Sequence, residues 1–362
     1  MRTLNRYIAG LYTWNVLVLL LVIFALVVVV DLFVNLEEFS RAAGEIAETS
    51  DGAGSGLRHA LLTSMLVIDL WWPRILQLFN YLVGVVLVTA MGFTCWQLVR
   101  HREFVAMLSS GISLHRAMRP LMIVGLVFIV IAGLNQELII PRIAHLLNRD
   151  PRNSGQRAPV AFSIPLTPDG AGHVFLAREF DDEHERMLLV HVWSADEQGR
   201  LTSMTRADEA DWDGSAWVLR NQGAEGTVAR VESPLDPMQF RVRHVRGFGQ
   251  NLSWRQISRM LEQPGLPDTD RERLQRARWG RFGGLISAYL TLIVAIPFFL
   301  RRSPGPMLGP SLKAAPVCVL GLAAGAASSA AIFPGLPIWL GAFIPCLILA
   351  PFAIALTSGV KS

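Results

Sequence analysis

The sequence predicts an α-helical membrane protein with six transmembrane helices, three on each side of an inserted all-β domain. Hydrophobic residues make up 52% of the 362 residues and charged residues only 17%, whereas about a quarter of a typical soluble domain is charged. The hydrophobic residues gather in long runs at both ends of the chain, and about 20 in a row are needed to cross the hydrocarbon core. Residues 142–275 carry frequent charges and contain no such run.

The first span is expected over residues 11–34, which contain no charged residue before Asp31. Arg2 and Arg6 precede this span, and the acidic segment 37–51 follows it. Because basic residues are enriched on the cytoplasmic side of membrane spans, the N-terminus is expected in the cytoplasm and the acidic loop outside. The apolar run is too long for a cleaved signal peptide, so it is expected to remain as a membrane anchor.

Residues 57–72 are apolar but interrupted by ionisable residues, which predicts a segment on the membrane surface. The second span is expected over residues 75–99. It must stop before Arg100, because a charge at the bilayer centre costs on the order of 3 kcal/mol. The third span is expected over residues 121–140, with Pro141 ending it.

Residues 142–275 show the short alternating segments that are typical of β-strands. Such segments occupy residues 173–180, 187–193, 201–211, 216–221, 227–231 and 238–245. Asp213-Gly214 is a hairpin turn signal, and short strands joined by tight turns predict an antiparallel sandwich or jelly roll. A short amphipathic helix is expected over residues 252–261. Because three spans precede this domain, it is expected outside, in the periplasm.

Three further spans are expected after a basic helical segment at residues 271–279. Gly, Ala and Ser dominate the second of them, a composition typical of close contact between helices. The basic loop that contains Arg301, Arg302 and Lys313 is expected in the cytoplasm, as is Lys361 near the C-terminus. These spans are predicted over residues 282–300, 314–333 and 339–356, which divides the chain into residues 1–141 (spans one to three), 142–275 (β domain) and 276–362 (spans four to six).

The loop between the second and third spans, residues 98–119, is basic and amphipathic. Within it, residues 103–110 predict a short helix with Phe104 and Leu108 on one face. Gly111 is suited to end this helix, and Ser113 to begin the next. Two interpretations are open. The loop is either a docking helix for a separate motor protein or a solvated turn whose arginines only fix the topology.

Composition disfavours several functions. The net charge of +4 is too small to indicate nucleic-acid binding, and the chain has no phosphate-binding loop for ATP. The three cysteines lie in apolar runs and are expected to be buried thiols. The histidines of the β domain show no ligand spacing, so no metal or other cofactor is expected. These histidines are His173, His184, His191 and His244.

Two motifs carry a family resemblance. Asn5-Arg-Tyr-Ile8 precedes the first span, and residues 102–113, Arg-Glu-Phe-Val-Ala-Met-Leu-Ser-Ser-Gly-Ile-Ser, follow the second. With weaker similarity over residues 278–297 and 335–345, the chain resembles the LptF/LptG (YjgP/YjgQ) family. These proteins are the permeases of the lipopolysaccharide-export ABC transporter. The similarity leans slightly toward the LptG-like branch, and the choice between the two branches stays open.

The resemblance implies a permease half without enzymatic activity, a multi-pass protein of the cell inner membrane with both termini in the cytoplasm. It implies three kinds of protein partner: a cytoplasmic ABC ATPase dimer, a second permease of the same family, and periplasmic bridge proteins built from jellyroll domains. The transported ligand would be lipopolysaccharide or a related membrane lipid, received by the β-jellyroll-like domain.

The resemblance also makes residues 102–111 the expected coupling helix. In helix-in-groove complexes, apolar residues anchor the helix and a polar residue fixes its register. Phe104, Met107 and Leu108 are the expected anchors, Glu103 is the expected polar contact with the ATPase, and Gly111 ends the helix.

Lipid phosphates need positive charge near the outer interface, and arginine suits bidentate phosphate contacts. The candidates are Arg41, Arg276, Arg278 and Arg281. The last three equally fit interfacial anchors whose stems lie along apolar surface. LptG-like proteins tend to have a basic cluster after the first span. This chain has Leu36-Glu-Glu-Phe39 and a single arginine there, so the partner permease would supply the charge, or the lipid would carry fewer phosphates.

Three other functions are weighed against this one. Permeases of other lipid or lipoprotein exporters usually have four spans, with the external domain after the first. A membrane-anchored sensor would need a cytoplasmic output domain, and the longest predicted internal segment is the loop of residues 98–119. A membrane enzyme would need ionisable residues facing a cavity within the spans.

Overall fold

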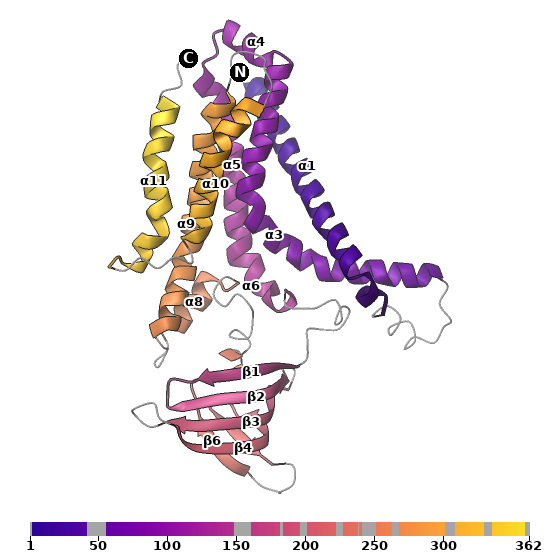
Figure 1. Ribbon diagram of the computed structural model, residues 1–362, viewed down its shortest axis with the longest axis vertical. Coiled ribbons are helices and arrows are strands. Elements are labelled where there is room, and N and C mark those ends of the chain that lie inside the picture. The colour runs from indigo at the N-terminus through magenta and orange to yellow at the C-terminus, as the bar shows by residue number, and fades with distance from the viewer. Residues whose placement is uncertain are drawn as a thin grey trace. The chain divides into compact units, whose positions relative to one another are not determined.

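The computed structural model describes residues 2–41, 56–147, 161–181, 184–195, 201–221, 227–237, 239–240, 251–262, 268–300, 308–328 and 335–358. The chain divides into two compact units (Figure 1). The helical unit comprises Met1–Val34, Arg74–Ile140 and Gln275–Ser362, and the β unit comprises Asn35–Pro73 and Pro141–Leu274.

Long apolar helices build the helical unit. Among the described residues, five helices are long and apolar enough to cross a membrane. They are α1 (Arg2–Val34), α3 (Gly56–Arg100), α5 with its continuation through α6 (Leu114–Leu134 and Ile140–Ile143), α9 (Asp268–Phe299) and α11 (Ile338–Ser358). The helix α10 (Leu308–Ala327) is equally apolar, but its described span is shorter. The short helix α4 (Glu103–Ser109) joins α3 to α5.

Two boundaries differ from the sequence prediction. Residues 57–72 were expected to be separate from the second span, but α3 is one continuous helix with Pro73 inside it. Pro141 was expected to end the third span, but helical turns continue to Ile143. The π-helix Asn135–Ile139 lies just before this proline. It leaves Pro141 in the first turn of α6, where a missing backbone N–H is tolerated.

The first half of α1 is held by one line of buried residues. Ile8, Tyr12, Val16 and Leu20 recur every four residues and join the core formed with α3, α5 and α9. The hydroxyl of Tyr12 donates to the carbonyl oxygen of Leu87 at 2.9 Å. Hydrocarbon offers polar groups no water, so such hydrogen bonds between helices fix which faces meet.

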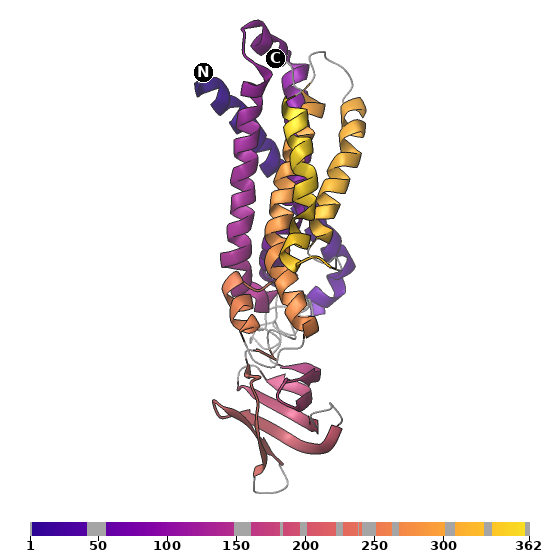
Figure 2. The ribbon, with the colours of Figure 1, turned by 90° about the vertical axis from the view of Figure 1, so that its left-hand side faces the viewer.

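Small residues lie where α9 meets α10 and α11. Figure 2 shows these three helices from the side. A Cβ added at Gly283 on α9 would collide with the backbone carbonyl of Ala342 on α11. Ser287 on α9 donates to the carbonyl oxygen of Gly321 on α10 at 3.0 Å. The predicted role of Gly, Ala and Ser in close helix contact is therefore confirmed at the α9–α10 contact.

The described strands form one antiparallel sheet in the order β1-β2-β3-β4-β5-β6. They are β1 (Ala161–Pro168), β2 (His173–Asp181), β3 (Arg186–Ala195), β4 (Leu201–Trp212), β5 (Ala216–Arg220) and β6 (Thr227–Glu232). Each strand therefore pairs with the next one along the chain. The sequence prediction missed β1. It was wrong at Gln239 and Phe240, which are helical, while the rest of the expected strand at 238–245 lies outside the described residues.

Along three neighbouring strands, the alternation of buried and exposed side chains is interrupted at positions that pair with one another. Buried positions step by three rather than two, from Ala177 to Phe180 on β2 and from Met187 to Val190 on β3. The step from Ala207 to Ala210 on β4 matches them. Leu189 has a left-handed φ of 51° at this level. The break keeps one face of the sheet on a core that includes Trp217 and Phe240.

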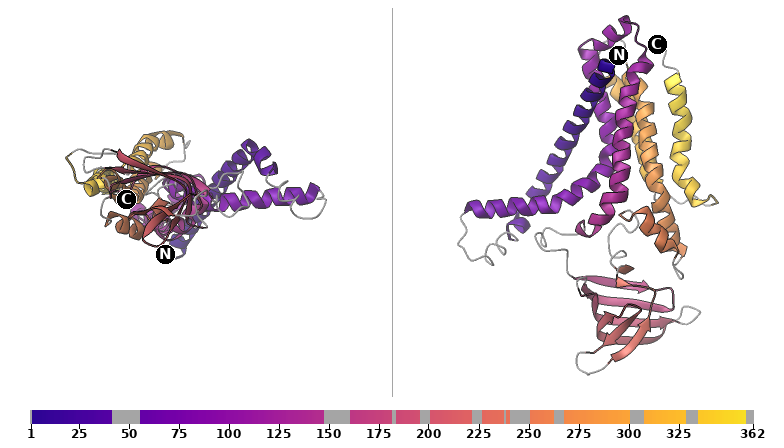
Figure 3. Two further views of the ribbon diagram at one scale, coloured as in Figure 1. Left: turned by 90° about the horizontal axis from the view of Figure 1, so that it is seen from below. Right: turned by 180° about the vertical axis from the view of Figure 1, so that it is seen from behind.

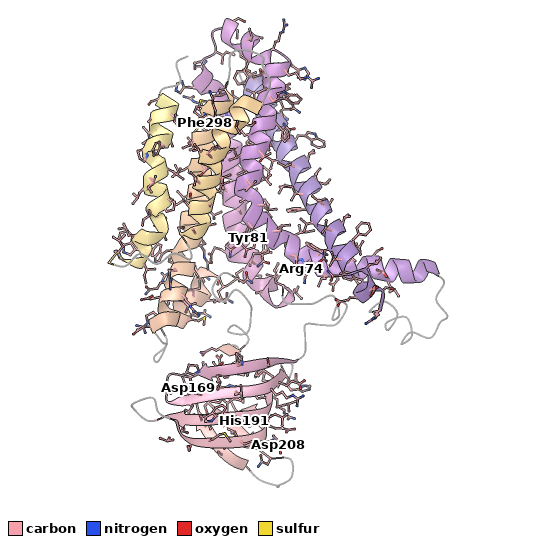
Figure 4. The ribbon with its side chains drawn as sticks, viewed as in Figure 1. Arg74, Tyr81, Asp169, His191, Asp208 and Phe298 are labelled. Atoms are coloured by element: carbon pink, nitrogen blue, oxygen red, sulfur yellow. The ribbon has the colours of Figure 1, made fainter. Side chains whose placement is uncertain are left out.

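Two aspartates organise turns of the β unit. Asp169, labelled in Figure 4, is buried and accepts hydrogen bonds from the backbone and side chain of His173 and from the hydroxyl of Ser233. Asp213 forms the predicted hairpin turn, in which Gly214 has a φ of 98°. The backbone amides that bond Asp213 lower the pKa of its carboxyl group. The expected amphipathic helix is also present as α8 (Trp254–Leu261).

Two adjacent glycines of α9 give a matched test of the contact with α11. We expect Gly283→Ala to lower the free energy of unfolding by about 1–3 kcal/mol, the usual cost of overpacking. Gly284→Ala should be neutral or slightly stabilising, because its Cβ would meet the nearest atom at an ordinary 3.5 Å and alanine favours helix. Thermal unfolding of the purified protein in detergent measures both. Equal stability of the two variants would contradict the close contact.

Candidate functional site

The connection between α3 and α5 is a capped helical hairpin. Arg102 precedes α4 with a left-handed φ of 56°, which turns the chain sharply after α3. Gly111 follows α4 with a φ of 77°, and the amide of Ile112 donates to the carbonyl oxygen of Met107 at 3.1 Å. This six-residue bond is the mark of a Schellman cap, so the prediction that Gly111 ends this helix is confirmed. Ser113 is the N-cap of α5, although its side chain makes no capping bond.

One face of α4 packs into the helical unit itself. Phe104 is 2% exposed and Met107 is 7% exposed, and both belong to the core that contains Leu98 and Leu300. These residues were predicted as anchors for a partner, but in this structure the chain's own helices cover them. The backbone of Leu108 lies in α4, and its side chain is outside the described residues.

The opposite face of α4 is open. Val105 is 46% exposed, and Ala106, Ser109 and Gly111 are exposed as well. This face was not identified as a docking surface from the sequence, because the side chains of Ala106 and Ser109 are small. The available signal was the helical period: residues 105, 106 and 109 lie opposite the side that carries 104 and 107.

Glu103 connects α4 to the start of α1. The hydroxyl of Tyr7 donates to Oε1 of Glu103 at 2.9 Å. A second bond joins the start of α5 to the end of α11, where His115 Nε2 donates to the carbonyl oxygen of Thr357 at 2.8 Å. The start of α1, the end of α11 and α4 therefore lie at one end of the helical unit, as Figures 1 and 3 show.

Arg281, predicted as a phosphate contact, has a partner inside the chain. Its Nη1 lies 2.6 Å from Oε1 of Glu137, and the side chains of Arg281 and Glu137 are 8% and 24% exposed. Glu137 belongs to the π-helix between α5 and α6. The pair therefore ties α9 to the end of the helix that follows α4.

A polar network surrounds the same π-helix. Asn135 is buried, and its Nδ2 donates to the carbonyl oxygen of Leu76 at 2.8 Å and to Oδ1 of Asn80 at 3.0 Å. Nδ2 of Asn80 donates to Oε1 of Gln136 at 2.7 Å. Single-turn π-helices occur frequently at functional sites. The sequence signal was the run of three polar residues, 135–137, near the end of the predicted third span.

The other predicted phosphate contacts lie on α9 and in the β unit. Arg276 and Arg278 are half-buried on α9, and the guanidinium of Arg278 lies 5.7 Å from the ring centre of Trp279. This stacking fits an interfacial anchor as well as a ligand contact. Arg41 is exposed and belongs to the β unit.

Metal-binding residues do not cluster within the described ranges, where no group of three His, Cys, Asp or Glu side chains could hold an ion. His173 and His184 bond to nearby aspartates, and His191 stacks on Trp193. These contacts give the three histidines structural roles in the strands and turns. His244 lies outside the described residues.

Long apolar helices, a capped helix between two of them and an inserted β-sheet are the architecture of a multi-pass membrane protein. The model of the lipopolysaccharide export system permease LptF/LptG family matches residues 62–358. The chain belongs to this family, which consists of transporter permeases of the inner membrane rather than enzymes. No curated protein matches the chain at a significant level.

The Arg281–Glu137 pair can be tested by a double-mutant cycle. We expect Arg281→Ala and Glu137→Ala each to cost on the order of 3 kcal/mol in free energy of unfolding, because each leaves a partly buried charge without its partner. The double variant should cost much less than the sum. Denaturation of the purified protein in detergent measures the cycle. Strict additivity of the two losses would show that the pair does not couple α9 to the π-helix.

Proposed function

We propose that this chain is one permease half of an ABC exporter that extracts lipopolysaccharide from the inner membrane, powered by a separate ATPase chain. The observation that carries this proposal is α4, a capped helix with one face buried in the membrane helices and the other face open. A solvated loop that only set the topology would need neither the cap at Gly111 nor the buried Phe104.

In this proposal the ATPase contacts Glu103 and the open face of α4, formed by Val105, Ala106 and Ser109. Phe104 and Met107 couple α4 to the core, so that a push on the open face reaches the spans. Packed cores respond to such a push by moving as units rather than by local compression. Leu108 remains a proposed anchor for the ATPase.

The proposed topology has six spans. Five are long enough within the described residues, and α10, with 20 residues, has the length that about 30 Å of hydrocarbon requires at 1.5 Å per residue. We assign to the cytoplasm the end of the helical unit that carries α4, the start of α1 and the end of α11. Its support is the basic segment around α4, which follows the positive-inside rule.

The second half of α1 supports a lateral interface. Only 11% of the most apolar stretch of α1 is buried inside the protein. The corresponding values are 61% for α3 and 50% for α9. Leu26 and Phe33 on α1 and Leu320 on α10 are largely exposed. We assign these apolar faces to acyl chains and to a second permease of the same family. The proposed contacts for lipid phosphates remain Arg41, Arg276, Arg278 and Arg281. The guanidinium of Arg281 would then have to bind both a phosphate and the carboxylate of Glu137.

We assign residues 142–275 to a periplasmic β-jellyroll-like domain that receives the lipid from the spans. The two outer strands of the described sheet, β1 and β6, each leave one edge to which a neighbouring strand can add. Periplasmic bridge proteins with similar domains would continue the sheet at one of these edges.

The coupling role of Glu103 can be separated from its bond to Tyr7. We expect Glu103→Lys to leave the protein in the membrane but to weaken association with the ATPase about 30-fold, the equivalent of losing a 2 kcal/mol contact. ATPase stimulation should fall with it. Co-purification with the tagged ATPase and the hydrolysis rate measure the effect.

The matched control is Tyr7→Phe, which removes the hydrogen bond inside the chain and leaves the carboxylate in place. It should couple normally. A defect in Tyr7→Phe equal to that of Glu103→Lys would mean that Glu103 acts within the permease and does not contact the ATPase.

The topology predicts that α4 and the β-sheet lie on opposite sides of the membrane. Ser109→Cys and Met204→Cys each introduce a cysteine at an exposed position, on α4 and β4, in a protein whose three native cysteines are replaced by serine. An impermeant maleimide added to cells with a permeabilised outer membrane should label only the β4 position, and lysis should expose the α4 position. Labelling of both positions before lysis would refute the arrangement.

A further inference from the structure

A cleft opens between α5, α9 and α11 at the end of the helical unit that carries α4. Its volume is about 530 Å³, within the usual range of small-molecule sites. Its walls are mainly aliphatic side chains and methionines, and its polar groups come from the ends of α5 and α11. The lining residues are His115, Met118, Arg119, Met122, Leu290, Ile293, Ala350, Ala353, Ile354 and Thr357.

The helices around this cleft are held in place by specific contacts. His115 Nε2 bonds to the carbonyl oxygen of Thr357 and so joins α5 to α11 at the rim. Ile293 and Ala353 pack together in a buried cluster that joins α9 to α11. The cleft is therefore bordered by α5, α9 and α11, which these contacts join, and it is open at the protein surface.

The ionisable residues described in the lining of the cleft are basic: Arg119 and His115. Arg119 is exposed, and the described residues of the lining include no acidic residue. His115 uses Nε2–H to bond Thr357, which leaves Nδ1 for an acceptor or, when protonated, a second donor role. An apolar body below a cationic rim complements an amphipathic anion whose charge lies at the membrane surface and whose chains lie in the hydrocarbon.

We propose that this cleft binds an anionic phospholipid of the cytoplasmic leaflet, with its phosphate on Arg119 and an acyl chain along Met122, Leu290 and Ala350. The choice of leaflet rests on the orientation given under Proposed function. Basic pockets between spans on this side of a membrane are suited to anionic head groups. The site lies at the α4 end, where an occupied cleft would brace α5 and α11 against each other.

Native mass spectrometry of the full chain tests the site. The protein is delipidated in detergent and titrated with phosphatidylglycerol or with phosphatidylcholine of the same chains. We expect a saturable phosphatidylglycerol adduct and an affinity about fivefold lower for phosphatidylcholine, the factor expected from one basic residue near the membrane surface. Equal affinity for the two lipids would overturn the proposal.

Two arginines of α5 provide the charge control. Arg119→Gln should lower the affinity for phosphatidylglycerol about fivefold, whereas Arg116→Gln should leave it unchanged, because Arg116 is equally exposed but does not line the cleft. Equal losses in both variants would indicate general attraction to a basic surface and would refute a specific site.

Two alanines of α11 provide the shape control. Ala350→Phe should fill the cleft and abolish the adduct, whereas Ala355→Phe lies on an exposed part of α11 outside the lining and should retain it. Thermal unfolding of each variant confirms that it is folded. Retained binding in a folded Ala350→Phe protein would refute the site. The titration involves no ATPase, so its outcome is independent of the coupling role proposed for Glu103.

Discussion

The absence of water in the membrane interior is the constraint on which the helical unit depends. Any polar group that enters hydrocarbon must find its partner within the protein. The hydroxyl of Tyr12 meets the backbone of α3, and Nδ2 of Asn15 donates to both Thr94 and Gln97. These bonds fix the rotation of α1 against α3. Apolar packing alone would fix it less well, because lipid chains solvate leucine and valine as readily as a neighbouring helix does.

The burial of apolar side chains also determines which face of α4 is exposed. An amphipathic helix at the membrane surface buries its more apolar face in whatever lies behind it. Here Phe104 and Met107 fill that role against the core of the helical unit. The exposed face of α4 is therefore formed by Val105, Ala106 and Ser109. If the ATPase binds this face, as proposed, these short side chains fit a shallow groove better than a deep one.

The β-sheet has a core of its own, which large aromatic side chains close. Trp217 and Phe240 are almost fully buried, and Phe175, Phe180 and Phe240 pack as ring pairs. The coordinated step in burial across β2, β3 and β4 keeps Phe180, Met187 and Ala210 on this core. Turn aspartates such as Asp169 and Asp213 then fix the hairpins through bonds to backbone amides.

The sequence alone determined the features that depend on neighbouring residues. Within the described residues, hydropathy located the five helices that are long enough to cross a membrane. The Gly111 cap and the Asp213 turn were predictable because each needs only a few adjacent residues. Residues that meet across long separations could not be predicted. Tyr7 and Glu103 are 96 positions apart, and Glu137 and Arg281 are 144 apart. Only the tertiary structure decided that an apparent phosphate ligand pairs with Glu137 and that apparent partner anchors lie in the core. An amphipathic pattern tells which side of a helix is apolar, but not whether that side meets the same chain or another one.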